Sequence, residues 1–127
     1  MIPYDRSIDP PAPVVEVIIR HPTTGVWEAL SAQLDTGADI SGIPQRLVDR
    51  LGLAPVRVVP IEGYDDARVL LSTYIVRLEV AGVRFRGVEV VPIPGERTLL
   101  GRDVLNCLYI HLNGPELTFD LSPSPPG

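Results

Sequence analysis

The sequence predicts an all-β domain with two short helices, and three observations lead to this prediction. The chain has 11 Gly and 14 Pro among 127 residues, about a fifth of its length against roughly an eighth in average proteins. Val and Ile cluster in short runs that turn residues separate, which is typical of strands. Hydrophobic residues make up 45% of the chain. This fraction is enough for a packed core, so wholesale disorder is excluded.

The first half of the chain predicts two strands, a polar loop and a helix. A run rich in β-branched residues, VVEVIIR at 14–20, predicts a strand, and a turn at 21–25 leads into a second strand at 26–34. A polar loop at 35–39 follows directly. Residues 44–51 predict a helix because Pro suits the first helical position and Gly52 suits the residue after the end.

The central part predicts three strands. We expect strands at 56–61 and 67–80, joined by the polar turn 62–66. In the second of these, apolar residues alternate with Arg and Glu, as in a half-buried strand. A third strand is expected at 83–91, where the apolar phase slips at Gly87 and predicts a bulge.

The last part predicts a short apolar strand at 98–100, a helix at 102–108 and a hairpin. Asn113-Gly114 is a strong hairpin signal between the expected strands 109–112 and 116–121. One domain fits this length. We expect it at 14–121, with a Pro-rich N-terminal arm at 1–13 and a flexible C-terminal tail at 122–127.

Composition excludes several classes of protein. The net charge is −5 and every positive side chain is Arg. These arginines are interleaved with carboxylates along the sequence, so no basic stripe predicts nucleic-acid binding. No apolar run approaches the roughly 20 residues of a membrane span, and the N-terminus does not read as a signal peptide. The single cysteine, Cys107, fits a reducing compartment and predicts a cytoplasmic location. With one cysteine and two histidines in the chain, a Cys/His zinc site is improbable, and we expect no metal or cofactor.

Two linked motifs carry the candidate chemistry. Asp35-Thr36-Gly37-Ala38-Asp39 follows an apolar strand, and sixty-odd residues later comes Leu99-Leu100-Gly101-Arg102-Asp103. A lone Asp-Thr-Gly is weak evidence, because all three residues are common in ordinary turns. Two motifs in this order make a chance match much less frequent.

With these motifs, the chain resembles the retropepsin-like aspartic proteases, the single-lobe relatives of retroviral proteases, of the bacterial and cellular type. The resemblance covers roughly residues 14–121 and implies a closed, barrel-like acid-protease fold. It implies that Asp35 is the catalytic aspartate, with Thr36 and Gly37 completing the triplet. Leu99, Leu100 and Gly101 would support the triplet from beneath. Arg102 and Asp39 would form an ion pair, with Ala38 and Asp39 facing bound peptide. The alternative for that pair is two separate solvated charges.

The chemistry of this class requires two carboxylates that share one proton. Like charges about 3 Å apart cannot both ionise, so one stays an acid and the other a base. The base activates a water, and the acid polarises the scissile carbonyl. This chain holds one Asp-Thr-Gly. The mechanism therefore predicts a homodimer in which each chain supplies one Asp35, with extended peptides or unfolded proteins as substrates.

The loop at 62–66 corresponds to the flap of the family, and Glu62, Gly63 and Tyr64 are candidate substrate contacts. Retroviral flaps carry several glycines at the tip, whereas this loop has one, so a plain hairpin turn is the alternative. Cys107 is expected to face the core and Trp27 to pack within its strand. Two rival functions stay open: an inactive dimerisation or peptide-binding domain of the same fold, and a metal-dependent hydrolase using the abundant carboxylates.

Overall fold

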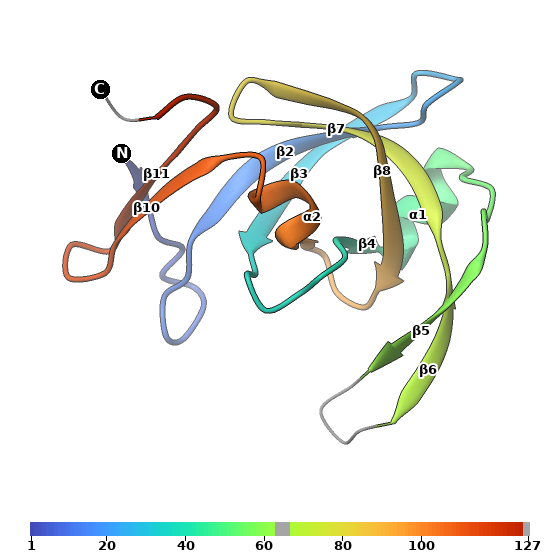
Figure 1. The fold of residues 1–127 in the computed structure, drawn as a ribbon, viewed down its shortest axis with the longest axis horizontal. Helices are drawn as coiled ribbons and strands as arrows, with labels where there is room; N and C mark the ends of the chain where they lie inside the picture. The colour runs from blue at the N-terminus through green and yellow to red at the C-terminus, as the bar shows by residue number, and fades with distance from the viewer. Residues whose placement is uncertain (63–66, 126–127) are drawn as a thin grey trace.

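A closed barrel of six strands forms the body of the protein (Figure 1). The computed structural model describes residues 1–62 and 67–125. Its elements run in the order β1 (Ile2–Pro3), β2 (Val14–Arg20), β3 (Trp27–Leu34), β4 (Gly42–Pro44), α1 (Gln45–Leu51), β5 (Val58–Glu62), β6 (Arg68–Ser72), β7 (Tyr74–Val80), β8 (Val83–Ile93), β9 (Thr98–Leu100), α2 (Arg102–Leu105), β10 (Tyr109–Asn113) and β11 (Thr118–Ser122). The predicted all-β class with short helices is confirmed.

The barrel closes in the order β2-β3-β9-β4-β8-β7. β2 and β3 form an antiparallel hairpin, whereas β3 and β9 run parallel, with Leu34 opposite Leu100. The short strand β4 pairs antiparallel with β9 and parallel with β8. The parallel pairing has a direct consequence. The carboxyl ends of β3 and β9, and hence the residues that follow them, lie at the same end of the barrel.

The core fills the barrel with side chains from alternate strand positions. In β7, Val76, Leu78 and Val80 are buried while Arg77 is exposed, which confirms the alternation predicted for this strand. β2 contributes Val17 in the same way. The remaining buried apolar side chains of this core come from β2, β3, β4, β8, β9 and the two helices: Ile19, Leu30, Ala32, Ile43, Leu47, Val48, Leu51, Val88, Val90, Leu100, Val104 and Leu105.

The helix α1 ends where the sequence predicts. Gly52 has φ 67° in the left-handed region, and its N–H donates to the Asp49 carbonyl oxygen. A glycine adopts this conformation without a Cβ penalty. The helix α2 is shorter than predicted and stops at Leu105. Cys107 therefore lies beyond it and is exposed, so the prediction that it faces the core was wrong. Trp27 is also 51% exposed and lies under the Arg20 guanidinium at 5.8 Å.

The strand predicted at 67–80 is divided at Thr73. There the chain leaves one sheet for another. The Thr73 N–H donates to the Arg57 carbonyl at 2.7 Å, and the Thr73 carbonyl accepts from the Val56 N–H at 2.8 Å. Before this point β6 pairs with β5, and after it β7 pairs with β8 and β2. The alternation of apolar and charged residues at 76–80 gave no sign of this change of partner.

The bulge predicted at Gly87 is confirmed. Val76 pairs with Val88 and Leu78 pairs with Phe85, so one residue of β7 stands opposite two residues of β8. Such an insertion bends the strand and increases its twist. It lets β8 follow the barrel wall over 11 residues.

The two ends of the chain meet in a separate three-stranded sheet, β1-β11-β10. Ile2 pairs with Phe119, whose side chain is 1% exposed, and the Tyr4 ring lies 6.0 Å from it. The N-terminal segment is thus held by a strand of its own chain. Among the described residues, no helix has the length and apolar character needed to cross a bilayer.

A three-residue network fixes the base of the β5–β6 hairpin to the barrel. Arg57 donates two hydrogen bonds to the Glu89 carboxylate, at 2.6 and 2.8 Å, and the buried Thr73 hydroxyl donates a third at 2.6 Å. Hydrogen bonds from Arg57 and then Thr73 lower the pKa of Glu89 to about 2, against an ordinary value of 4.5.

This network predicts an acid-sensitive contribution to stability. A depressed carboxylate pKa stabilises the folded state above the unfolded pKa, and the contribution is lost as the pH falls through the folded value. We expect Glu89→Gln to lower the melting temperature at pH 7, and the gap to the wild type to close between pH 4.5 and pH 2. The control is Glu16→Gln, an exposed glutamate whose carboxylate has no hydrogen bond or ion pair within residues 1–62 and 67–125. An equal gap at all pH values would contradict the prediction.

Candidate active site

Parallel pairing of β3 with β9 brings the two sequence motifs together. The N–H of Asp35, directly after β3, donates to the Leu100 carbonyl in β9 at 2.9 Å. The Arg102 N–H donates back to the Ala38 carbonyl at 2.8 Å. Leu100 itself is fully buried. The loop at 35–39 is therefore hydrogen-bonded to the segment 99–102.

The Asp35 carboxylate is oriented by its own loop. Its Oδ1 accepts the Gly37 N–H at 3.0 Å, and its carbonyl accepts the Ala38 N–H at 3.2 Å. A Cβ at position 37 would lie 3.2 Å from the same Oδ1, so glycine permits this close approach. Asp35 is half-buried, whereas Thr36 and Gly37 are exposed. No described residue donates to Asp35 Oδ2, which leaves that oxygen available to a water or a second carboxylic acid.

Beneath the loop lies a network that the sequence analysis missed. The fully buried Ser41 hydroxyl donates to Asp103 Oδ1 at 2.7 Å and accepts the buried Gly101 N–H at 2.9 Å. The Ser41 N–H donates to Asp103 Oδ2 at 3.0 Å. Ser41 and Asp103 thus join the two motifs from below. They are 62 positions apart, and no pattern within either motif indicates the pairing.

Gly101 is required by the closeness of the two segments. A Cβ at this position would lie 2.9 Å from the Ala38 carbonyl oxygen, 3.0 Å from the Ile40 carbonyl carbon and 3.1 Å from Asp103 Oδ1. Two of these atoms belong to the backbone and cannot move aside cheaply. The glycine of the second motif is therefore explained by backbone packing against the first motif.

The predicted ion pair between Arg102 and Asp39 is not formed in this chain. The Arg102 guanidinium instead donates to the Thr36 carbonyl at 2.6 Å. Asp39 is exposed, and it forms no salt bridge with any residue in the described part of the chain. The Arg102 side chain therefore holds the triplet through the backbone carbonyl of Thr36. Asp39, in the same loop, has an exposed carboxylate.

Asp39 borders a pocket of about 320 Å³ next to the Asp35 loop. Ile40, Phe85 and Val88 give it an apolar wall. Its two other carboxylates already have partners, since Glu89 is bound by Arg57 and Asp103 by Ser41. The pocket therefore combines an apolar wall with one uncompensated negative charge.

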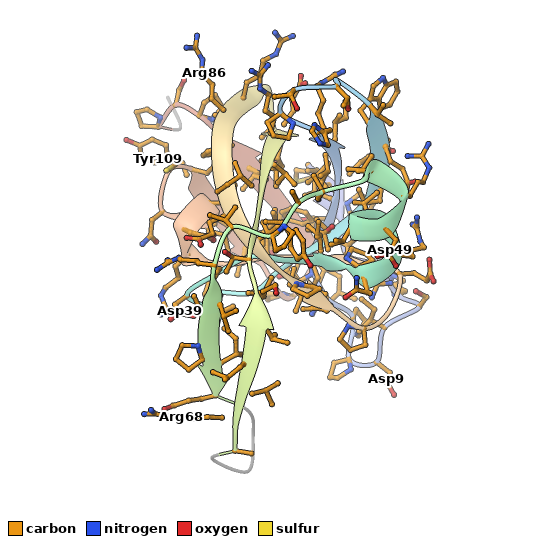
Figure 2. All side chains as sticks on the ribbon, turned by 90° about the vertical axis from the view of Figure 1, so that its right-hand side faces the viewer. Asp9, Asp39, Asp49, Arg68, Arg86 and Tyr109 are labelled. Carbon is orange, nitrogen blue, oxygen red and sulfur yellow. The ribbon has the colours of Figure 1, made fainter. Side chains whose placement is uncertain are left out.

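The candidate flap is only partly described. Glu62 ends β5 and its carboxylate lies 3.6 Å from Arg68 across the hairpin. Gly63 and Tyr64 lie outside the described residues. Figure 2 shows the β5–β6 hairpin projecting from the barrel, with Arg68 near its end. Among the described residues, no group of three His, Cys, Asp or Glu side chains is placed to hold a metal ion.

Comparison with protein families identifies this arrangement. Residues 28–107 match the family described as "gag-polyprotein putative aspartyl protease". This range holds both motifs and most of the barrel. The chain belongs to the retropepsin-like aspartic protease family. No curated protein sequence gives a significant match.

Solved structures of this family share the fold. The solution structure of simian foamy virus (mac) protease matches with TM-score 0.56 and 21% identity, over 74% of this chain and 92% of that one. The EIAV protease in complex with the inhibitor HBY-793 matches with TM-score 0.54 and 29% identity, over 75% and 86%. A retropepsin-like aspartic protease from Rickettsia conorii matches with TM-score 0.53 and 15% identity, over 87% and 94%. The barrel is thus a retropepsin-like fold.

Proposed function

We propose that this protein is a homodimeric aspartic endopeptidase in which two Asp35 carboxylates, one from each chain, activate a water. The observation that carries the proposal is the Asp35 side chain, held through Oδ1 by the Gly37 N–H. Its other oxygen is left without a donor among the described residues. One chain supplies one such carboxylate, whereas the acid-base chemistry needs two. A two-fold axis through the Asp35 loops provides the second.

In this mechanism one Asp35 is ionised and its partner copy is protonated. The ionised carboxylate takes a proton from the water while the water oxygen forms a bond to the scissile carbonyl carbon. The protonated carboxyl gives its proton to the carbonyl oxygen, which forms a tetrahedral diol. Proton transfer to the amide nitrogen then breaks the C–N bond, and the products are a carboxylic acid and an amine. Gly37 and Arg102 keep the loop in place during these steps.

The proposed substrate is a polypeptide in extended form. Its backbone would lie between the Asp35 loop and the β5–β6 hairpin, with Ala38, Asp39, Glu62, Gly63 and Tyr64 as proposed contacts. An apolar side chain fits the wall of Ile40 and Val88, and the free Asp39 carboxylate disfavours acidic side chains there by like-charge repulsion. We propose no metal or cofactor for this reaction. The exposed Cys107 thiol is compatible with the reducing cytoplasmic setting that we propose.

The proposal predicts that activity depends on dimer formation. Because a single chain holds half of the carboxylate pair, cleavage of denatured casein per mole of chain should rise steeply with protein concentration and level off when the dimer is saturated. The dimer fraction is measured in parallel by analytical ultracentrifugation. A statine-type mimic of the tetrahedral intermediate should inhibit, since such mimics bind far more tightly than substrates. Full activity of a chain that is monomeric by sedimentation would contradict the mechanism.

The second candidate is an inactive dimerisation or peptide-binding domain of the same fold. The feature that favours it is the glycine-poor loop at 62–66. Incubation with denatured casein between about pH 4 and 7 covers the range expected for a shared carboxylate proton. Binding of the casein without cleavage over this whole range would favour the second candidate. Chelator treatment in the same assay distinguishes both from metal-dependent hydrolysis.

A further inference from the structure

A second cleft shares Phe85 with the Asp39 pocket and extends from there away from the Asp35 loop. It has a volume of about 720 Å³ and is formed by β2, β7 and β8. Arg20, which borders it, is paired with Trp27 at the start of β3, whereas Asp35 follows the end of the same strand. The eight residues of β3 separate the two places by roughly 23 Å. Figure 2 shows Arg86 at the end of the molecule opposite to the β5–β6 hairpin.

Four arginines line this cleft: Arg20, Arg77, Arg84 and Arg86. The sequence spreads them over 67 positions (residues 20–86) and intersperses carboxylates, so they do not look like a cluster. Strand pairing brings them together. Arg20 stands directly opposite Arg77, and Arg77 stands opposite the bulge that contains Arg86. The three positions therefore form a row across three neighbouring strands, whose backbones span about 10 Å at the usual strand spacing.

The positive charge of this row is not neutralised within the described chain. The only acid in the cleft is Glu79, and its carboxylate lies 3.7 Å from Arg84. Arg20 donates to a neutral group, the Gly25 carbonyl, at 3.2 Å. The side chains of Arg77 and Arg86 have no hydrogen bond or ion pair with any described residue. Like charges that face each other across strands destabilise a sheet, which makes an external anion a favourable partner.

We propose that this cleft binds a compact phosphate compound through Arg20, Arg77 and Arg86. A phosphate group carries about −1.5 to −2 charges and three acceptor oxygens, which matches three positive charges in a row. A guanidinium offers a planar fork of N–H donors that suits such oxygens. A cleft of this volume holds a small molecule. Its concave wall of Ile18 and Phe85 beside the arginines fits a compact ligand better than an extended strand.

Titration with tripolyphosphate tests this site. Calorimetry at constant ionic strength should detect saturable binding with one site per chain. Arg77→Gln and Arg86→Gln should each weaken binding about tenfold or more, because each removes a charge-assisted hydrogen-bond donor. The matched control is Arg6→Gln, which removes the same charge from an exposed arginine without a partner in the described chain. It should leave binding unchanged.

Further measurements test whether weaker binding reflects a loss of folding, and whether the site prefers phosphate over other anions. Without ligand, Arg77→Gln should not lower the melting temperature, since it removes like-charge repulsion. Tripolyphosphate should raise the melting temperature of the wild type and of Arg6→Gln equally, and that of Arg77→Gln clearly less. Citrate, a carboxylate anion, should bind at least about tenfold more weakly, since each of its groups offers fewer acceptor oxygens and less charge. Equal binding of citrate, equal loss in Arg6→Gln, or no binding by the wild type would overturn the proposal. Tighter binding of a 20-nucleotide single strand than of tripolyphosphate would also overturn it.

Discussion

Asp35→Asn should abolish peptide hydrolysis while the dimer and the fold remain. The amide keeps the shape of the side chain and still accepts the Gly37 N–H at its oxygen. It cannot take up a proton from the water, and it cannot share one with the partner carboxyl. Loss of one member of a catalytic set that acts as a unit costs at least about a thousandfold in kcat. The measurement is cleavage of denatured casein by pure protein at equal dimer fraction.

Asp49→Asn is the matched control for this substitution. Asp49 lies on the exposed face of α1 (Figure 2). Among the described residues, its carboxylate accepts a hydrogen bond from the Gln45 side-chain amide alone, at 3.2 Å. The chemical change is the same, but it is made outside the loop. This variant should keep full activity. Cleavage by pure Asp35→Asn protein at more than one per cent of the wild-type rate, a level set by that same thousandfold scale, would overturn the assignment of Asp35.

Ser41→Ala should have the largest effect on stability among the substitutions considered. The change leaves the buried Gly101 N–H without its hydrogen-bond acceptor, and it removes one of the hydrogen bonds that the Asp103 carboxylate accepts. An unsatisfied buried polar group costs about 1–3 kcal/mol, and two groups are affected. We expect a loss of about 2–3 kcal/mol in the free energy of unfolding. This corresponds to a fall of roughly 10 °C in Tm for a domain of this size.

The same substitution should also lower kcat without a matching rise in KM. The loop at 35–39 rests on the segment that Ser41 holds, so its loss affects the position of Asp35 more than the walls of the substrate groove. Ser31→Ala is the control, because Ser31 is exposed on β3. Melting and kinetics are compared at one protein concentration, since dimer dissociation also shifts Tm. An unchanged Tm would contradict the structural role of Ser41.

Local patterns predicted those parts of the fold that depend on neighbouring residues. Alternation along β7, the bulge at Gly87 and the glycine after α1 are each encoded within a few positions, and each is confirmed. The division at Thr73 could not be predicted, because it depends on which strand offers the next hydrogen-bonding partner. The position of Cys107 was predicted wrongly for a related reason: α2 ends after one turn, at Leu105, and Cys107 lies beyond it and is exposed.

In the candidate site, too, features that depend on neighbouring residues could be predicted, and contacts between distant residues could not. The two motifs name the loop and the segment beneath it, and their resemblance to a family supplies the expected roles. The Ser41–Asp103 contact and the use of Arg102 on the Thr36 carbonyl depend on side-chain geometry across more than sixty positions. An acid directly after Gly101-Arg102 reads as the start of a helix, and nothing in the sequence assigns it to a buried serine.

The parallel contact between β3 and β9 also bears on the order of folding. The Asp35 loop is held by hydrogen bonds with residues much further along the chain: the Asp35 N–H donates to the Leu100 carbonyl, and the Ala38 carbonyl accepts the Arg102 N–H. Such non-local contacts form late because a long stretch of chain must first be closed into a ring. A nascent chain that has not yet emerged beyond residue 103 therefore has no ordered carboxylate to offer. We expect newly made chains not to cleave other unfolded polypeptides until the barrel has closed.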